Sequence, residues 1–359
     1  MSKTDLYTLG LTELLKQESR LYAELYVARV SVQHKHLYKV ITENGEITAE
    51  ISGKLAFSVQ DKSGYPTVGD WVMVDRTQSN AGHAIINAVL QRRSILERKA
   101  AGNTQECQLI AANIDTIFIC MSLNNDFNLR RMERYLAIAW DSMAIPVIIL
   151  TKADLCPNIS DKLSELHLVA PGVDILVTSS RSQEGYAEIM KYIDFGKTVA
   201  FIGSSGVGKS TLINCLAGTE VFVTQEIDQY DKGRHTTTHR QLIVLPTGGI
   251  VIDTPGMREL QLETADLSKA FADIDQLAQN CRFDDCSHQN EPGCAVKAAI
   301  ETGTLLVERL ISYQKLQAEL NYQGMNSRQL EQAKIKRMFG SFGGMKEAQR
   351  SMKEKNKRK

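Results

Sequence analysis

The stretch GSSGVGKST, which begins at Gly203, has the residue types and the spacing of a loop that binds phosphate groups. It fits G-x-x-x-x-G-K-[ST] and lies between a strand-like apolar run and a helix-like segment. Glycines let backbone N–H groups surround phosphate oxygens, while Lys209 can reach the terminal phosphates and the Ser210 hydroxyl can bind Mg²⁺. The residues predicted to form this cradle are Gly203, Ser204, Ser205, Gly206, Val207, Gly208, Lys209, Ser210 and Thr211.

A second phosphate-binding element is predicted in VIDTPG. Asp253 ends an apolar run, where its carboxylate can hold Mg²⁺, and Gly256 can offer its N–H to the terminal phosphate. Between the two elements, DKGRHTTTHRQL supplies the threonines expected on a mobile segment that closes on Mg²⁺. The candidates are Thr236, Thr237 and Thr238, of which the spacing favours Thr237 or Thr238.

The motif Thr151-Lys152-Ala153-Asp154 has the chemistry to read a guanine base. The Asp154 carboxylate can accept two hydrogen bonds from the guanine edge, a donor pair that adenine lacks, and the Lys152 stem can lie along the base. The segment TSS at 178–180, which includes Ser179, follows the next strand-like run and resembles the element behind the guanine oxygen. Together these motifs predict a site for GTP or GDP with Mg²⁺.

The order of these motifs is unusual. Both base-reading elements precede both phosphate-binding elements, whereas the common order of a GTPase places the phosphate loop first. Strand–helix units can be reordered cyclically without changing the packed sheet, because only the positions of the termini change. We therefore expect a circularly permuted GTPase domain, an α/β fold with a mostly parallel sheet and helices on both faces.

Three cysteines and one histidine crowd into CRFDDCSHQNEPGC. Thiolates and an imidazole at this spacing favour one structural Zn²⁺ in a closed tetrahedral site with no open position for catalysis. A disulfide is disfavoured in the cytosol. The predicted ligands are Cys281, Cys286, His288 and Cys294.

Charge is unevenly distributed along the 359 residues, although the net charge is zero. Ten Lys or Arg and two acids between Lys334 and Lys359 give the C-terminal tail a charge of +8, so the remainder carries −8. A basic tail indicates either a polyanionic partner such as nucleic acid or simply a solvated segment. No apolar run is long enough for a membrane span and no signal peptide is evident, so a cytoplasmic location is expected.

The hydrophobic periodicity divides the chain into several regions. Five short strand-like runs between Tyr26 and Leu90 predict an OB-type β-barrel, and a polar connection at 91–108 leads to the alternating strands and helices of the GTPase domain. From 266 onward the pattern is helical. The predicted limits are an extension at 1–22, the barrel at 23–95, the GTPase domain at 96–262, a helical zinc-binding domain at 263–330 and a basic tail at 331–359.

From about residue 25 to 325 the chain resembles the RsgA (YjeQ) family of small-ribosomal-subunit biogenesis GTPases. The resemblance rests on VGDWV, AANIDTIFI, RRMERYLA, TKADL, GSSGVGKSTLIN, GRHTTTHRQL, DTPGMREL and CRFDDCSH. It implies GTP hydrolysis late in assembly of the small (30S) subunit, stimulated by that subunit. It also implies that the barrel and the zinc domain contact 16S rRNA. We expect a monomer with no membrane or DNA partner.

Residue 257 is a methionine, where many GTPases have a glutamine that orients the attacking water. Slow turnover of the free protein is therefore expected, and the resemblance implies His235 as the catalytic candidate, against the alternative of a structural loop histidine. Two other functions stay open: a GTPase switch that regulates a protein partner without RNA binding, and an RNA-binding scaffold with a vestigial nucleotide site. The intact Lys209, Ser210, Asp253 and Asp154 argue against the scaffold.

Overall fold

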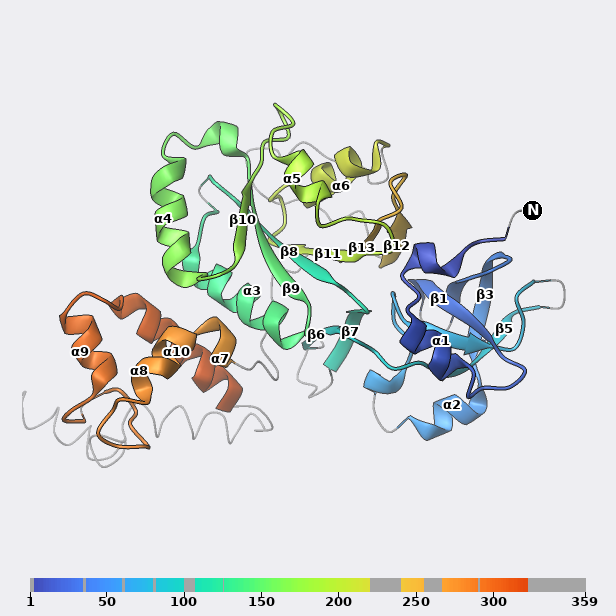
Figure 1. Ribbon diagram of the computed structural model, residues 1–359, viewed down its shortest axis with the longest axis horizontal. Coiled ribbons are helices and arrows are strands. Elements are labelled where there is room, and N and C mark those ends of the chain that lie inside the picture. The colour runs from blue at the N-terminus through green and yellow to red at the C-terminus, as the bar shows by residue number, and fades with distance from the viewer. Residues whose placement is uncertain are drawn as a thin grey trace, which may run out of the picture.

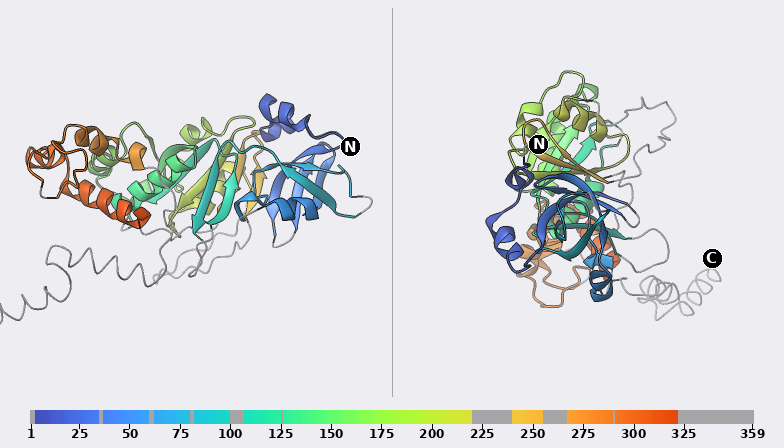
Figure 2. Two further views of the ribbon diagram at one scale, coloured as in Figure 1. Left: turned by 90° about the horizontal axis from the view of Figure 1, so that it is seen from below. Right: turned by 90° about the vertical axis from the view of Figure 1, so that its right-hand side faces the viewer.

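The computed structural model describes residues 3–34, 37–59, 62–79, 82–99, 107–124, 126–219, 240–254, 267–289 and 291–321 (Figure 1). These residues form an elongated molecule with a β-barrel at one end, an α/β sheet in the middle and a group of helices at the other end (Figures 1 and 2). Within the described residues, none of the helices combines the length and the apolar character that a membrane span requires.

The barrel is made of five short strands, as the OB-type prediction requires. Its strands are β1 (Tyr26–Gln33), β2 (Tyr38–Thr42), β3 (Gly45–Ile51), β4 (Trp71–Val74) and β5 (Ala84–Val89). They pair in the order β1-β2-β3-β5-β4, and β4 returns to β1 to close the barrel. The interior is filled by small and β-branched side chains such as Val30, Val40, Val72 and Ile86, which are fully buried. Closure at this strand number confirms the expected barrel.

Short elements cover the outside of the barrel. The 3-10 helix η1 (Leu6–Leu9) and helix α1 (Glu13–Ser19) pack Leu9 and Leu15 against Trp71 and Leu90. The Thr12 hydroxyl caps α1 by accepting the N–H of Leu15, at an oxygen–nitrogen distance of 3.3 Å. Helix α2 (Gly53–Ser58) and η2 (Lys62–Gly64) connect β3 with β4.

The central sheet has the order β10-β9-β8-β11-β13-β12. Its strands are β8 (Thr116–Ser122), β9 (Ile145–Thr151), β10 (Asp174–Val177), β11 (Thr198–Gly203), β12 (Gln241–Val244) and β13 (Ile250–Asp253). All neighbours are parallel except β12, which runs antiparallel to β13. The strand that leads into the phosphate loop, β11, lies at the centre of the sheet although three sheet strands precede it in sequence. This is the connectivity expected of a circularly permuted GTPase domain.

Helices cover both faces of this sheet because side chains on each strand alternate between the two faces. Ile117 and Ile119 point into the core shared with α3 (Leu129–Asp141) and α4 (Ile159–Val169), and this core continues into the C-terminal helices. Phe118 and Phe201 point to the opposite core, which is closed by α5 (Tyr186–Met190) and α6 (Lys209–Ala217). The strands are therefore buried on both sides, as in other parallel sheets.

The connection between barrel and sheet is more structured than the sequence suggests. The predicted polar connection contains β6 (Ile95–Lys99), which pairs with β7 (Cys107–Ala112) as a separate two-stranded sheet. Strand β1 of the barrel also pairs with β12 through Val32 and Gln241. The strands of the barrel and of the central sheet therefore form one continuous hydrogen-bonded sheet. At the same junction the buried guanidinium of Arg29 donates to the Thr198 hydroxyl at 2.9 Å.

The C-terminal region is helical, as predicted. It comprises α7 (Leu267–Ala270), α8 (Ala272–Ala278), α9 (Ala295–Glu301) and α10 (Val307–Asn321), beside α3 (Figure 1). The anchor is Arg309 on α10, which is only 3% exposed. Its guanidinium donates to Glu133 of α3 at 3.0 Å and to both carboxylate oxygens of Asp273 at 2.5 and 2.7 Å. This network fixes the helical region to the central domain.

Candidate nucleotide and metal sites

The phosphate loop lies where β11 ends and α6 begins. Its conformation depends on glycine, since Gly203, Gly206 and Gly208 have φ of 146°, 78° and 99°. A Cβ on Gly203 would lie 2.3 Å from the backbone oxygen of Cys120, so this position also excludes a side chain. The chain can therefore turn tightly enough to direct successive N–H groups toward one point, as an anion site requires.

Lys209 lies inside this loop and is 9% exposed. Its ammonium group donates to the backbone oxygens of Gly203 and Ser204, each at 2.7 Å. Burial lowers the pKa of Lys209, and the nearby Cys120 and Asp253 act in the opposite direction. A cation held in a partly dry loop is suited to contact a phosphate, because Coulomb interactions strengthen away from water.

Asp253 ends β13 beside the phosphate loop. The β11–β13 register pairs it with Phe201, two residues before the loop begins. Burial raises the pKa of Asp253 to about 6, and the charge of Lys209 opposes that shift. A buried carboxylate beside the start of α6, where Ser210 lies, is an oxygen donor set suited to Mg²⁺.

The base-reading motif contacts the phosphate loop directly. The Thr151 hydroxyl donates to the backbone oxygen of Val207 at 2.5 Å, and the Lys152 ammonium donates to the backbone oxygen of Gly206 at 2.8 Å. The Ser179 hydroxyl donates to the Asp154 carboxylate at 2.7 Å. Three segments far apart in the sequence thus meet at the carboxyl ends of the parallel strands β9, β10 and β11, at the edge of the sheet where ligands bind in open α/β folds.

Several predicted residues fall outside the described parts of the chain. They are His235, Thr236, Thr237, Thr238 and Gly256. Their roles stay predictions.

The four predicted zinc ligands converge in the C-terminal region. Their ligand atoms all lie within 4.8 Å of one another. The Cys281 sulfur is 3.9 Å from the Cys294 sulfur, and His288 Nδ1 is 3.7 and 3.5 Å from these two sulfurs. A tetrahedral zinc ion with bonds of about 2.3 Å to sulfur and about 2.0 Å to nitrogen separates such ligands by roughly 3.5 to 3.8 Å. Cys281, His288 and Cys294 therefore have the spacing of a tetrahedral site, and the Cys286 sulfur lies within 4.8 Å of each of them, so the four residues could hold a metal ion.

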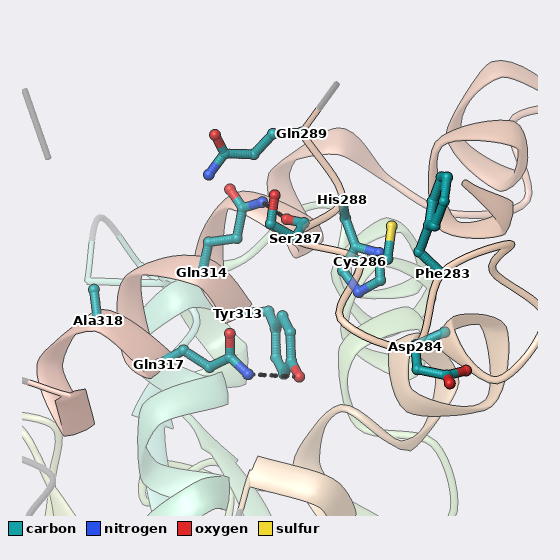
Figure 3. A pocket seen from close by; sticks show the side chains of 11 residues that line it. Phe283, Asp284, Cys286, Ser287, His288, Gln289, Tyr313, Gln314, Gln317 and Ala318 are labelled. Carbon is teal, nitrogen blue, oxygen red and sulfur yellow. Dashed lines mark hydrogen bonds between the residues drawn. The ribbon is translucent and has the colours of Figure 1, made fainter. Parts of the chain in front are cut away.

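The loop around this cluster is held by its own hydrogen bonds. The Glu291 carboxylate accepts the backbone N–H groups of Ser287 at 3.0 Å and Gln289 at 2.9 Å. The hydrogen bond from the Ser287 side chain is the main reason why the pKa of Glu291 falls to about 2. A pocket of about 460 Å³ lies between this loop and α10, and two metal-ligand residues, Cys286 and His288, are among those that line it (Figure 3).

Comparisons with known proteins agree with this geometry. The RsgA GTPase family model matches residues 89–263. The small ribosomal subunit biogenesis GTPase RsgA 2 of Lactiplantibacillus plantarum is 54% identical over 94% of this chain and 95% of its own length. The chain belongs to the RsgA GTPase family. An RsgA 2 of Vibrio parahaemolyticus is 45% identical over 89% of this chain and 86% of its own.

Solved structures show the same RsgA architecture. YjeQ from Thermotoga maritima has a TM-score of 0.62 and 27% identity, covering 82% of this chain and 98% of its own. The circularly permuted GTPase YloQ has a TM-score of 0.58 and 25% identity, covering 84% and 96%. The permuted order inferred from the motifs is therefore confirmed at the level of the fold.

Three residues at the phosphate loop were not among the predicted site residues. Arg131 of α3 donates to the Ser204 hydroxyl and, at 2.6 Å, to the Asp126 carboxylate. Tyr135, one turn further along α3, also hydrogen bonds with Ser204. The stretch RRMERYLA contributed to the family resemblance, but nothing in its spacing indicates contact with a loop 73 residues away.

Proposed function

We propose that this protein is a GTPase that binds the small ribosomal subunit during its late maturation and hydrolyses GTP faster when bound. The principal support is that Thr151 and Lys152 of the base-reading motif hydrogen bond directly to the phosphate loop. The chain is also 54% identical to a small ribosomal subunit biogenesis GTPase. The expected products are GDP and phosphate, and the expected location is the cytoplasm.

In this proposal the nucleotide is held at two ends. Asp154, oriented by Ser179, accepts the two guanine donors, while Thr151 and Lys152 tie that motif to the phosphate loop. Backbone N–H groups from Ser204 to Thr211 and the Lys209 ammonium hold the phosphates. Neutralising the phosphate charge in a preorganised loop provides much of what phosphoryl transfer needs.

Mg²⁺ would be held by Ser210, Asp253 and either Thr237 or Thr238, which precede β12 in the sequence. The Gly256 N–H would contact the terminal phosphate. When bound, Mg²⁺ supplies charge stabilisation on the phosphate oxygens. With Met257 in the usual glutamine position, positioning of the attacking water falls to another group, and His235 is our candidate.

The flanking regions would provide the ribosomal contacts. We assign rRNA binding to the barrel at 23–95 and the zinc domain at 263–330, with the basic tail at 331–359 as a further polyanion contact. Cys281, Cys286, His288 and Cys294 would hold Zn²⁺, which stabilises a loop of low apolar content. We propose that the protein acts as a monomer on 16S rRNA within the 30S subunit.

One experiment separates this function from a switch that acts on a protein partner. GTP hydrolysis is measured for the protein alone, with small subunits and with large subunits, at several salt concentrations. We expect stimulation by small subunits only, with binding that weakens steeply as salt rises, because phosphate contacts release counterions. Equal rates in all three mixtures would refute the proposed function and favour the protein-partner alternative.

A further inference from the structure

The side chain of Ser204 is held from outside the phosphate loop by α3. One guanidinium nitrogen of Arg131 donates both to the Ser204 hydroxyl and to the Asp126 carboxylate. Tyr135 reaches the same hydroxyl, and this hydrogen bond partly offsets the rise in the Tyr135 pKa that burial causes. Two residues one turn apart on a single helix therefore support one residue of the loop.

Ser204 is the second residue of the phosphate loop and is fixed on two sides. Its backbone oxygen accepts from Lys209 at 2.7 Å, while its hydroxyl accepts from Arg131. The loop binds phosphate through backbone N–H groups, whose directions depend on the placement of each peptide. A contact that fixes Ser204 therefore fixes part of the phosphate-binding surface.

Asp126 gives the arrangement an electrostatic role as well. Its attraction is one of the influences that raise the pKa of Lys209 against the larger effect of burial, so its carboxylate lies within electrostatic range of that ammonium. One oxygen of Asp126 pairs with Arg131, and the other is buried without a hydrogen-bond partner within the described residues. Without Arg131, this carboxylate would repel a polyphosphate in the loop.

The helix that carries Arg131 is itself immobilised. Glu133, two residues further on, is 3% exposed and accepts from the buried Arg309 at 3.0 Å. Burial raises the pKa of Glu133, while Arg309 acts to keep it ionised. Separating the two partners of a buried ion pair leaves an uncompensated buried charge, which is strongly destabilising. The Glu133–Arg309 pair therefore couples the position of α3 to that of the C-terminal helices. Arg131 is thus presented to the loop from a rigid support.

We propose that Arg131 is a positioning residue for GTP binding and hydrolysis, which fixes Ser204 and neutralises Asp126 beside the phosphate loop. The proposal rests on the proposed GTPase function of the same site. The charged groups that act on the phosphates would then include the Arg131–Asp126 pair, besides the two cations Lys209 and Mg²⁺.

The test compares Arg131→Ala, Asp126→Asn and the double variant in the full chain, by titration with fluorescent GDP and a non-hydrolysable GTP analogue. Arg131→Ala should weaken both nucleotides on the order of tenfold, as expected for like charges roughly 10 Å apart at an effective dielectric constant near 20. Raising the salt concentration should shrink this defect. The double variant should recover the part of the affinity that is lost to the unpaired Asp126 carboxylate, because that repelling charge is gone.

Arg130→Ala is the matched control, since Arg130 is an exposed neighbour of the same charge on the same helix. It should leave affinity unchanged and show that net charge alone is not responsible. If Arg131→Ala does not fold, Arg131→Lys replaces it; this change keeps the charge and should lose less than threefold in affinity.

Two results would overturn the proposal. One is a folded Arg131→Ala protein that binds both nucleotides as tightly as the parent does. The other is a defect that neither salt nor Asp126→Asn relieves, which would refute the neutralisation of Asp126 by Arg131. A parent protein that binds no guanine nucleotide would instead refute the proposed function, so the two failures are distinguishable.

Discussion

Replacing Asp154 with asparagine should change which base the site accepts. The Ser179 hydroxyl donates to one Asp154 oxygen at 2.7 Å, so an amide at this position is expected to keep its oxygen toward Ser179. Its NH₂ group would then face the base. Guanine presents two donors on this edge, so a donor would meet a donor, whereas xanthine presents a carbonyl oxygen that can accept.

The size of the effect follows from the bonds that change. A hydrogen bond to a charged group contributes about 1.5–3 kcal/mol, and leaving a donor unpaired adds a comparable penalty. We take about 3 kcal/mol as the net loss for Asp154→Asn, which is roughly a 100-fold weaker affinity for GDP. Ser179→Ala removes only a neutral donor that orients the carboxylate, at a cost of about 1 kcal/mol, or roughly fivefold.

Calorimetric titration of the full chain with GDP and with xanthosine diphosphate measures both effects. We expect Asp154→Asn to lose GDP affinity and gain affinity for the xanthine nucleotide, while Ser179→Ala weakens GDP mildly without changing base preference. Unchanged GDP affinity in the Asp154→Asn protein would show that TKAD does not read the base, whatever its contacts with the phosphate loop.

Other changes test the remaining parts of the molecule. Lys209→Ala removes the only side-chain cation within the loop, so phosphate release should fall to background in a protein whose circular dichroism is unchanged; persistent turnover would place the active loop elsewhere. Cys281→Ser should lower zinc from about one ion per chain by elemental analysis while nucleotide binding survives; a metal-free parent whose C-terminal region is well protected in hydrogen exchange would contradict the zinc assignment. His235→Ala should spare GTP affinity and subunit binding but abolish most of the stimulated rate, and full stimulation would leave it a loop residue only. Gly203→Ala should lower the free energy of unfolding by at least about 2 kcal/mol more than Gly45→Ala does. Both glycines have positive φ, but of the two only Gly203 has a backbone atom in contact with the added Cβ, so equal thermal stability of the two variants would contradict this steric argument.

Local patterns were sufficient to predict much of the fold. The alternation of apolar residues from Tyr26 to Leu90 was enough to predict a five-stranded barrel, and its closure is confirmed. The motifs at Gly203 and Thr151 each lie at a strand end, so their spacing predicted both the parallel sheet and its permuted order. These signals are visible because each depends on a few residues that are close together in sequence.

The contacts between distant segments were not predictable in this way. Arg309 pairs with Glu133 across 176 positions, and Arg131 reaches Ser204 across 73. An arginine in a helical pattern is expected to be a solvated side chain, and only the packing of the folded chain shows that it is not. Strands β6 and β7 were missed for a related reason, since the polar residues of β6 obscure its alternation and each strand is stabilised by the other.

The pairing of β1 with β12 affects whether the central sheet can associate with other molecules. Within the described residues, β12 would be an open edge of the central sheet if the barrel were absent, and β1 of the closed barrel partly covers it. The opposite edge is β10, which is only four residues long. Unpaired strand edges recruit strands from other molecules, and short edges recruit them poorly. A fragment cut to the GTPase segment alone would therefore expose β12 and be prone to edge-to-edge aggregation, which the attached barrel suppresses in the intact chain.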